Sequence, residues 1–379
     1  MAIFGFSFAF PFLSIFISKD LGVTQGRDLD LWTAAIASVS GLSMAIASPI
    51  WGVMGDRFGR KPMLLRSMIG GAITVGLIFF ARSPTELLIL RLLQGATSGT
   101  VAAATALVAA ETPRNRVGWA LGVVTSAVAL GGAIGPVVGG LAGAAFGLRL
   151  VFLGGGVLLL LSTIPVLVIV RESPRRTRLG PQVRTLDLIR QRPGAVRALT
   201  VLIGAQGLIN ICNSATQQLV VLRLLEMLSS GVSAVTGVAF GLAGVASSGA
   251  AVFYTQVTRR LGYVQTTALA AVMVAAAVSL MAIAPWAAVV VAGVALNGLF
   301  SGVVIPATAS MIGLEAPPEA QSTVFGANAS SVALGFAIGP LVGGGVAATE
   351  GVPAALIVIA GLALVLAALI AVGAREPTR

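Results

Sequence analysis

Histidine is absent from this 379-residue sequence, and cysteine occurs once, as Cys212. Without histidine the chain lacks the commonest metal ligand and the usual proton shuttle near neutral pH. A single cysteine permits neither an intramolecular disulfide nor a cysteine-based metal site. We therefore expect no metal and no cofactor, and a chemistry that uses carboxylates, arginine, amides and hydroxyl groups.

Charged residues are also scarce. They make up 10% of the chain, whereas hydrophobic residues make up 57%, and a soluble domain carries roughly a quarter charged residues. This composition predicts a protein embedded in a lipid bilayer. The net charge of +11 would suggest nucleic acid in a soluble protein, but here the basic residues lie in short gaps between apolar runs, where they set topology. We expect no nucleic-acid partner.

Twelve segments have the length and apolar character to cross the bilayer core, which needs about 20 mostly apolar residues. They form two sets of six, separated by a polar segment at 171–197. The first set is placed near 1–18, 32–54, 63–82, 86–110, 117–146 and 150–170, and the second near 198–226, 232–257, 265–284, 286–314, 322–348 and 352–373. The sequence therefore predicts an all-α membrane protein.

The loops between these segments differ in their content of Lys and Arg. With both termini in the cytoplasm, 18 of the 24 basic residues lie in interior loops and linker and only 4 in exterior loops. The exterior residues are Lys19, Arg27, Arg82 and Arg149. By the positive-inside rule, we expect a multi-pass protein of the plasma membrane, as in a bacterial inner membrane, with both termini cytoplasmic.

Two segments admit a second interpretation. The first apolar segment, 1–18, has the length of a signal peptide, but it lacks a basic start and a small-residue cleavage pattern, so we interpret it as a span. The segment 171–197 is rich in Pro, Gly and Arg, which is typical of a solvated linker. Its part Val183–Gln191 has the alternative of a short amphipathic helix on the membrane surface.

The two sets of six are internal repeats at an offset of about 204 residues. "GGAIGPVVGG" at 131–140 recurs as "GFAIGPLVGG" at 335–344, and "RESP" at 171–174 matches "REP" at 375–377. The similarity of Gly-rich helices explains the first match but not matches in loops. A duplicated six-helix unit is typical of a transporter with its substrate site between the halves. The predicted domains are therefore 1–170, the linker 171–197, and 198–379.

The loop after the second segment reads "GVMGDRFGRK", and its residues resemble a known family. The pattern G-x-x-x-D-R-x-G-R-K, which is typical of the major facilitator superfamily, is matched by Gly52, Asp56, Arg57, Gly59, Arg60 and Lys61. "RLLQG" at 91–95 and "GGAIGPVVGG" resemble the drug:proton antiporter branch. The resemblance implies the major facilitator fold: twelve helices in two pseudo-symmetric six-helix bundles.

In that family the loop signature belongs to a latch that joins the halves on the cytoplasmic side. The resemblance implies this role for Asp56, Arg57 and Arg60, whereas we expect Lys61 and Arg66 chiefly to set topology. Gly52 is expected to let helices approach, and Gly59 to permit a tight reversal. The second-half loop has Arg259 in place of Asp56, which predicts a latch in one half only.

Arg91 lies within the fourth segment, where a charge is costly unless it is paired or hydrated. Gln94 falls on the same helical face. The resemblance implies that Arg91 tunes a nearby proton-binding carboxylate; snorkelling of its side chain to the outer surface is the alternative. None of the 13 acids lies in the middle of a span. Asp20 and Glu226, at outer span ends, are the candidate proton-binding groups, with solvated end caps as the alternative.

Glycines recur every fourth residue in the fifth and eleventh segments. Such a stripe allows helices to pack almost backbone to backbone, and a proline within the helix introduces a bend. We expect these residues at an interface between the halves, where they would permit rocking; static packing is compatible with the same pattern. The residues are Gly131, Gly135, Pro136, Gly139, Gly140, Gly339, Pro340 and Gly343.

Four amides lie on one face of the seventh segment. They are Gln206, Asn210, Asn213 and Gln217, and their spacing of 4, 3 and 4 residues is helical. Amides in a membrane need partners, so this face predicts the lining of a substrate cavity, with interhelical hydrogen bonding as the alternative. Asn297 and Asn328 are further candidates of the same type.

The sequence thus predicts a monomeric secondary transporter that exports small amphipathic organic compounds in exchange for protons by alternating access. The alternatives are a facilitator or importer of one metabolite without proton antiport and, from another class, a receptor or scaffold. We expect no enzyme, because the chain lacks histidine and a carboxylate pair in mid-membrane.

Overall fold

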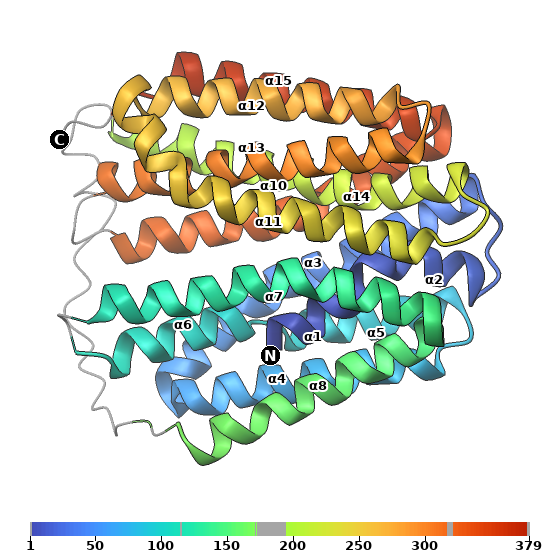
Figure 1. The fold of residues 1–379 in the computed structure, drawn as a ribbon. Coiled ribbons are helices and arrows are strands. Elements are labelled where there is room, and N and C mark those ends of the chain that lie inside the picture. Colours follow the sequence, from blue (N-terminus) through green and yellow to red (C-terminus); the bar gives the residue numbers. More distant parts are fainter. Residues whose placement is uncertain (1, 114–115, 171, 173–194, 317–320, 377–379) are drawn as a thin grey trace. The chain divides into compact units, whose positions relative to one another are not determined.

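The computed structural model describes residues 2–113, 116–170, 172, 195–316 and 321–376, which form helices and no strand (Figure 1). The helices before the linker are α1 (Ala2–Ala9), η1 (Phe10–Phe12), α2 (Leu13–Lys19), α3 (Arg27–Phe58), α4 (Arg60–Leu77), η2 (Ile78–Phe80), α5 (Pro84–Thr97), α6 (Thr100–Glu111), α7 (Val117–Phe146) and α8 (Leu148–Val168). Those after it are α10 (Ala195–Met227), α11 (Val232–Leu261), α12 (Tyr263–Ala282), α13 (Ala287–Glu315), α14 (Gln321–Glu350) and α15 (Val352–Gly373).

Among the described residues, eleven helical segments are long and apolar enough to cross a membrane. A shorter apolar helix, Phe4–Lys19, stands at the place of the predicted first span. Its helical pattern tightens to a 3₁₀ turn at Phe10–Phe12, where Pro11 has no backbone N–H to donate. The predicted all-α fold with twelve spans is confirmed, with the first span the shortest.

The predicted fourth span, 86–110, is not one continuous helix. It consists of α5 and α6, separated by Ser98 and Gly99. Gly99 has a φ of 119°, in the left-handed region that glycine adopts most readily. The break frees backbone groups in the middle of a span, and these need partners from neighbouring helices.

The chain divides into two compact units: Met1–Arg178 with Leu228–Gly244, and Leu179–Met227 with Val245–Arg379. The beginning of α11 falls in the first unit, where it packs closely on α7: a Cβ atom at Gly140 would lie 2.9 Å from the Cα of Gly237. The predicted domain boundaries stay a prediction. Most of the linker, including Val183–Gln191, lies outside the described residues.

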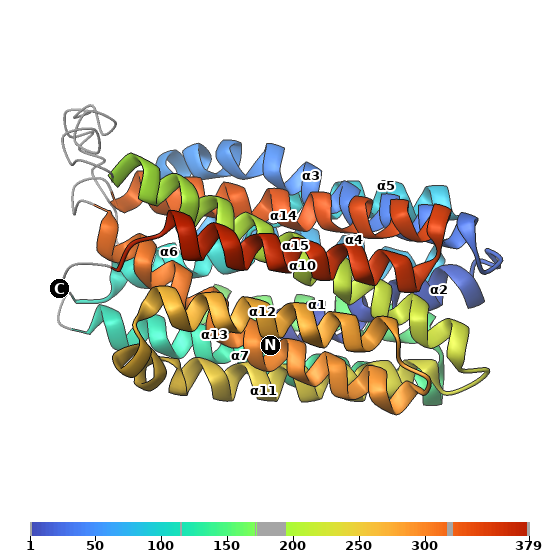
Figure 2. The same ribbon diagram turned by 90° about the horizontal axis from the view of Figure 1, so that it is seen from above.

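Corresponding helices pair within each unit. In the first unit α4 packs on α8 and α1 on α7. In the second unit α10 packs on α14, and α12 packs on α15, as Figure 2 shows. These are the same pairs at the offset of the internal repeat. The two units are therefore built on one plan, as expected from the duplicated sequence.

The glycine stripes lie inside these pairs. A Cβ at Gly135 would lie 2.7 Å from Ser7 Cβ on α1, and one at Gly335 would lie 2.7 Å from Asn210 Cβ on α10. Gly139, Gly339 and Gly343 face the same partner helices. At these positions each stripe packs on the first helix of its own unit, whereas Gly140 packs on Gly237 of α11, a helix of the predicted second half. The expected interface between the halves therefore stays a prediction. Pro136 and Pro340 lie inside their helices.

Candidate functional site

The predicted amide face of α10 is largely buried within the second unit. Gln206 is 3% exposed and Asn210 7%. The Asn210 Nδ2 donates to the Gln206 carbonyl at 2.8 Å, whereas Gln206 Oε1 is buried without a hydrogen-bond partner. An unpaired buried amide oxygen is costly, so Gln206 is a candidate to bind a polar group of a ligand.

Asn213 connects α10 to α13. Its Oδ1 accepts hydrogen bonds from Ser301 Oγ at 3.0 Å and from Asn297 Nδ2 at 3.4 Å. Asn297 Oδ1 is buried and has no partner. The structure thus brings together two of the polar residues that the sequence predicts, Asn213 and Asn297, with Ser301 as a third, on two helices of one unit. It leaves an acceptor among them open.

The other predicted cavity residues do not join this cluster by any contact in the described chain. Gln217 is exposed, while its neighbour Gln218 is buried with both polar side-chain atoms unpaired. Asn328 on α14 has a buried, unpaired Oδ1. The helical spacing therefore identifies the polar face at Gln206, Asn210 and Asn213, whereas the role of Gln217 in lining a cavity stays a prediction.

Arg91 on α5 contacts its own helix and two other elements of the first unit, α3 and η1. Its Nη1 donates to Gln94 Oε1 at 2.8 Å and its Nε to the Ile36 carbonyl at 3.4 Å. The guanidinium lies 4.4 Å from the ring centroid of Phe10. These contacts hold the side chain among helices, which favours the internal position over snorkelling.

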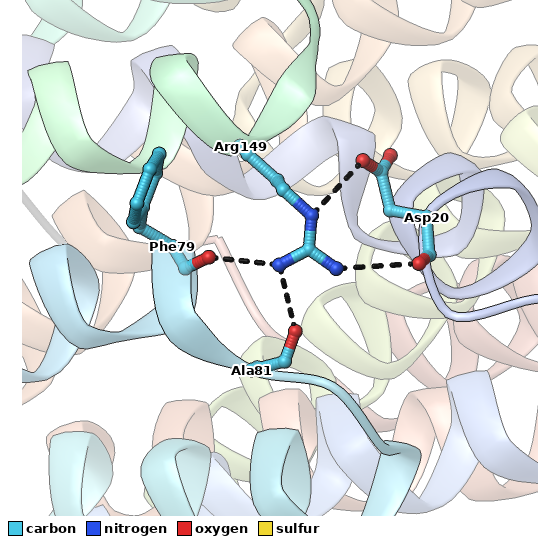
Figure 3. Close-up of polar contacts among 4 residues, drawn as sticks. All are labelled: Asp20, Phe79, Ala81 and Arg149. Atoms are coloured by element: carbon cyan, nitrogen blue, oxygen red, sulfur yellow. Dashed lines mark hydrogen bonds and ion pairs between the residues drawn. The ribbon is translucent and has the colours of Figure 1, made fainter.

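Asp20 and Arg149 lie together where α2 ends and α8 begins (Figure 3). Arg149 Nη1 donates to the carbonyls of Phe79 and Ala81, both at 2.8 Å, and Nη2 to the Asp20 carbonyl at 3.3 Å. Only Nε approaches the carboxylate, at 3.6 Å. Arg149 therefore binds three backbone carbonyls and makes a long ion pair.

Burial raises the pKa of the Asp20 carboxyl, and the charges of Arg149 and then Lys19 oppose that rise. The direction is consistent with the geometry, because most N–H groups of Arg149 bond carbonyls rather than the carboxylate. Glu226, the other candidate, accepts a hydrogen bond from Arg223 at 3.0 Å on the same helix, and Arg223 also donates to the Ala284 carbonyl at 3.3 Å. Each candidate acid thus has an arginine beside it.

The loop signature forms the junction of α3 and α4. Gly59 has φ 99° and ψ 157°, a region open essentially to glycine alone. Glu172 accepts hydrogen bonds from the backbone N–H groups of Arg60 at 2.6 Å and Lys61 at 3.0 Å. The carboxylate therefore caps the amino end of α4, where the helix dipole favours an anion.

The remaining signature residues have separate roles. Arg60 Nη1 donates to the Ala106 carbonyl at 2.6 Å, and Lys61 Nζ to the carbonyls of Leu167 at 3.0 Å and Val170 at 2.7 Å. Lys61 was expected chiefly to set topology, and the structure shows that it also caps the carbonyl end of α8. Arg57 is exposed, and the side chain of Asp56 lies outside the described part. A Cβ at Gly52 would meet no described atom within 4 Å, so the expected close approach at Gly52 is not found.

The second unit repeats the cap. Glu376 accepts hydrogen bonds from Tyr263 N at 2.9 Å and Val264 N at 2.8 Å, and Gly262 has a φ of 85°. The sequence contained the signal, because "RESP" and "REP" place Glu172 and Glu376 at equivalent positions. Their capping role was not predicted, since it requires knowing that the end of the sixth span returns to the start of the third.

Arg66 likewise has more contacts than the sequence predicts. Its guanidinium lies 3.6 Å from the Trp51 ring centroid, and its Nη2 donates to the Ser98 carbonyl at 3.0 Å. Trp51 Nε1 donates to the Ala96 carbonyl at 2.7 Å. These two side chains satisfy carbonyls at the break in the fourth span. The pattern "TSG" was a weak signal for that break.

Known proteins resemble this chain along its whole length. The chain is 30% identical to the multidrug resistance protein MdtG of Dickeya zeae, over 95% of this chain and 88% of the relative, and 31% identical to MdtG of Citrobacter koseri with the same coverage. A bacterial homologue of the human lysosomal transporter Spinster, in an inward-facing occupied conformation, has the same fold with a TM-score of 0.78 at 14% identity, covering 97% of this chain and 93% of that one. The Major Facilitator Superfamily matches residues 1–294 and 234–379. This chain is a transporter-type membrane protein that belongs to the major facilitator superfamily.

Proposed function

We propose that this chain exports small amphipathic organic compounds by proton antiport, through alternating access of one substrate site to the two sides of the membrane. The similarity to two proteins named for multidrug resistance, at 30% and 31% identity, supports export of this type. We propose no enzymatic activity.

The observation that carries the proposal is the polar cluster of Asn213, Asn297 and Ser301 on α10 and α13. Polar side chains inside a membrane bundle mark substrate paths. The open acceptor on Asn297 suits a hydroxyl or amide donor, while the apolar remainder of the helices suits the hydrophobic part of an amphipathic molecule. Because no acid lies in mid-span, an isolated cation would be desolvated at high cost, which favours neutral or anionic compounds.

Asp20 is the proposed proton-binding group. Its pKa is raised by burial, which brings the proton-bound form nearer to physiological pH. Arg91 with Gln94 would tune proton transfer, and Asp56, Arg57 and Arg60 would act as the latch, as the resemblance implies.

Everted membrane vesicles with an imposed pH gradient test the proposal. We expect a panel of amphipathic dyes to accumulate in vesicles that contain the wild-type chain, and accumulation to collapse when the gradient is dissipated. Asn213→Leu should lower accumulation at least tenfold. Thr200→Val, which removes a polar group from the exposed start of the same helix, should leave it unchanged. Absence of accumulation for every dye would refute export.

A second candidate, a facilitator or importer without proton coupling, is favoured by the arginines beside both acids. An acid that stays paired cannot exchange a proton during transport. In the same vesicles this function would give solute movement that ignores the pH gradient and is unaffected by Asp20→Asn, whereas antiport requires that Asp20→Asn abolish the dependence on the gradient.

A further inference from the structure

An open groove of about 830 Å³ runs along α12 and α15 in the second unit. Alanines are the most frequent residue in its lining. They are Ala268 on α12, Ala367, Ala368 and Ala371 on α15, and Ala374 just beyond the end of α15. From Leu364 to Ala374 the groove extends ten residues along the helix, about 15 Å at 1.5 Å per residue, which is half of a bilayer core of about 30 Å. The groove therefore has the length of one leaflet.

Several residues that line the groove differ from those at equivalent positions of the first unit. At the repeat offset, the first unit carries Ile164 in place of Ala368 and Leu167 in place of Ala371. On the α4 side, where the equivalent turns at Gly59 and Gly262 give an offset of 203, Leu65 stands where α12 has Ala268. The pairing of α4 with α8 and of α12 with α15 is the same in both units, so the difference lies in side-chain size. Where alanine stands in place of a larger residue, the volume of the missing side-chain atoms is left open, although the two helices pack in the same way.

The mouth of the groove differs in the same way. In the first unit Lys61 Nζ bonds the last carbonyls of α8, at Leu167 and Val170, so its side chain crosses this position. The equivalent residue in the second unit is Val264, which lines the groove and has no side-chain donor. Space is thus open at the mouth as well as along the floor.

The lining of the groove is apolar except for Gln265 and Glu376, and basic residues adjoin Glu376 and the loop that it contacts. Leu269 and Leu364, which line it, are 58% and 51% exposed within spans. At the mouth both carboxylate oxygens of Glu376 accept hydrogen bonds from backbone N–H groups at the start of α12. The exposed cation Arg375 directly precedes Glu376, and Arg259 and Arg260 directly precede the loop that Glu376 contacts. This end therefore combines three cations with one acid that is already satisfied.

We propose that the groove binds one acyl chain of an anionic phospholipid and that Arg375 and Arg260 bind its phosphate. The acyl chain fills the alanine-lined space by dispersion contacts, which drive association inside membranes. The basic mouth selects the anionic headgroup, as basic sites at the cytoplasmic ends of helices do. The leaflet is the one at the end that we predict to be cytoplasmic. The proposal is independent of what the protein transports.

Native mass spectrometry of the purified chain tests this site. The protein is titrated with phosphatidylglycerol or phosphatidylcholine of identical acyl chains, and the populations with one bound lipid are compared. We expect phosphatidylglycerol to bind more tightly, and each of Arg375→Gln and Arg260→Gln to lower that preference about fivefold, the effect of one basic residue near a membrane surface.

The double variant A368I/A371L gives α15 the first unit's side chains and should abolish binding of both lipids at this site. Val365→Leu, which adds bulk at an exposed position of α15 outside the groove, should bind as the wild type does. If the double variant is not monodisperse, Ala371→Leu alone carries the test. Equal binding by wild type and groove-filled variants, or no preference for phosphatidylglycerol in the wild type, would overturn the proposal.

Discussion

At the scale of single residues, a carboxylate and a glycine determine each sharp turn before α4 and α12. Gly59 and Gly262 adopt backbone angles that other residues rarely reach, and the carboxylates of Glu172 and Glu376 occupy the space beside them. Glycine is needed twice at each turn, once for its positive φ and once because a Cβ would collide with the cap.

Gly59→Ala should therefore destabilise the protein by about 1–3 kcal/mol, the cost of a residue held in this backbone region. The built Cβ would also lie 2.8 Å from Glu172 Oε2. The measurement is the thermal unfolding midpoint in detergent. Gly52→Ala, in the same signature but in a helix interior with no described neighbour, is the control and should be neutral or slightly stabilising. Equal effects of both changes would contradict this account of the turn.

Asp20 predicts a pH dependence whose sign follows from its raised pKa. A pKa above the ordinary aspartate value of 3.8 in the folded state means that the fold favours the protonated carboxyl. The resulting stability is fully present below pH 3.8 and is lost as the pH rises through the folded pKa. Asp20→Asn should remove this loss, so the melting temperatures of variant and wild type should diverge as the pH increases above about 4. Parallel curves would show that Asp20 does not titrate in this range.

At the scale of helices, arginines bind backbone carbonyls where helices end or break. Arg149 connects the end of α2, the turn after η2 and the start of α8, and Arg66 bonds the break between α5 and α6. Free carbonyls in or near a membrane need donors, and guanidinium supplies several in a fixed geometry.

Arg149→Lys should accordingly destabilise the first unit, because an ammonium group cannot reach all three carbonyls that the planar guanidinium binds. Loss of two hydrogen bonds that involve a charged group, at about 1.5–3 kcal/mol each, predicts a cost of about 3–6 kcal/mol. Arg82→Lys, at an exposed position in the same region, should change the melting temperature little. A similar shift for both variants would indicate a general charge effect rather than carbonyl binding.

Helix positions followed from the sequence because a span must be long and apolar, and the amide face followed from helical spacing. The break at Gly99 could not be predicted, because glycines are common in transmembrane helices. The side chains that donate hydrogen bonds to the carbonyls at the break, Arg66 and Trp51, also come from other helices. The burial of Gln218 and the exposure of Gln217 were also not predictable, because they depend on how α10 is oriented about its axis against the neighbouring helices.

At the scale of the whole molecule, duplication explains both what the units share and where they differ. The cap by Glu172 recurs at Glu376, and the α1–α7 pair recurs as α10–α14. Lys61 has no counterpart in the second unit, where Val264 lines a groove instead. Shared positions thus support the fold, and positions that differ between the repeats are the better candidates for separate functions.

The distribution of basic residues predicts that all loops beginning after an odd span lie outside. The single cysteine makes this testable: in a Cys212→Ala background, Ser230→Cys and Pro113→Cys introduce one thiol each at exposed positions. With both termini cytoplasmic, Ser230 follows the seventh span and Pro113 the fourth, so an impermeant maleimide should label the first in intact cells and the second only after lysis. The converse labelling would invert the topology and would also move the basic mouth of the groove to the outer leaflet. Because 18 basic residues lie on one side and 4 on the other, we expect the orientation with Pro113 inside.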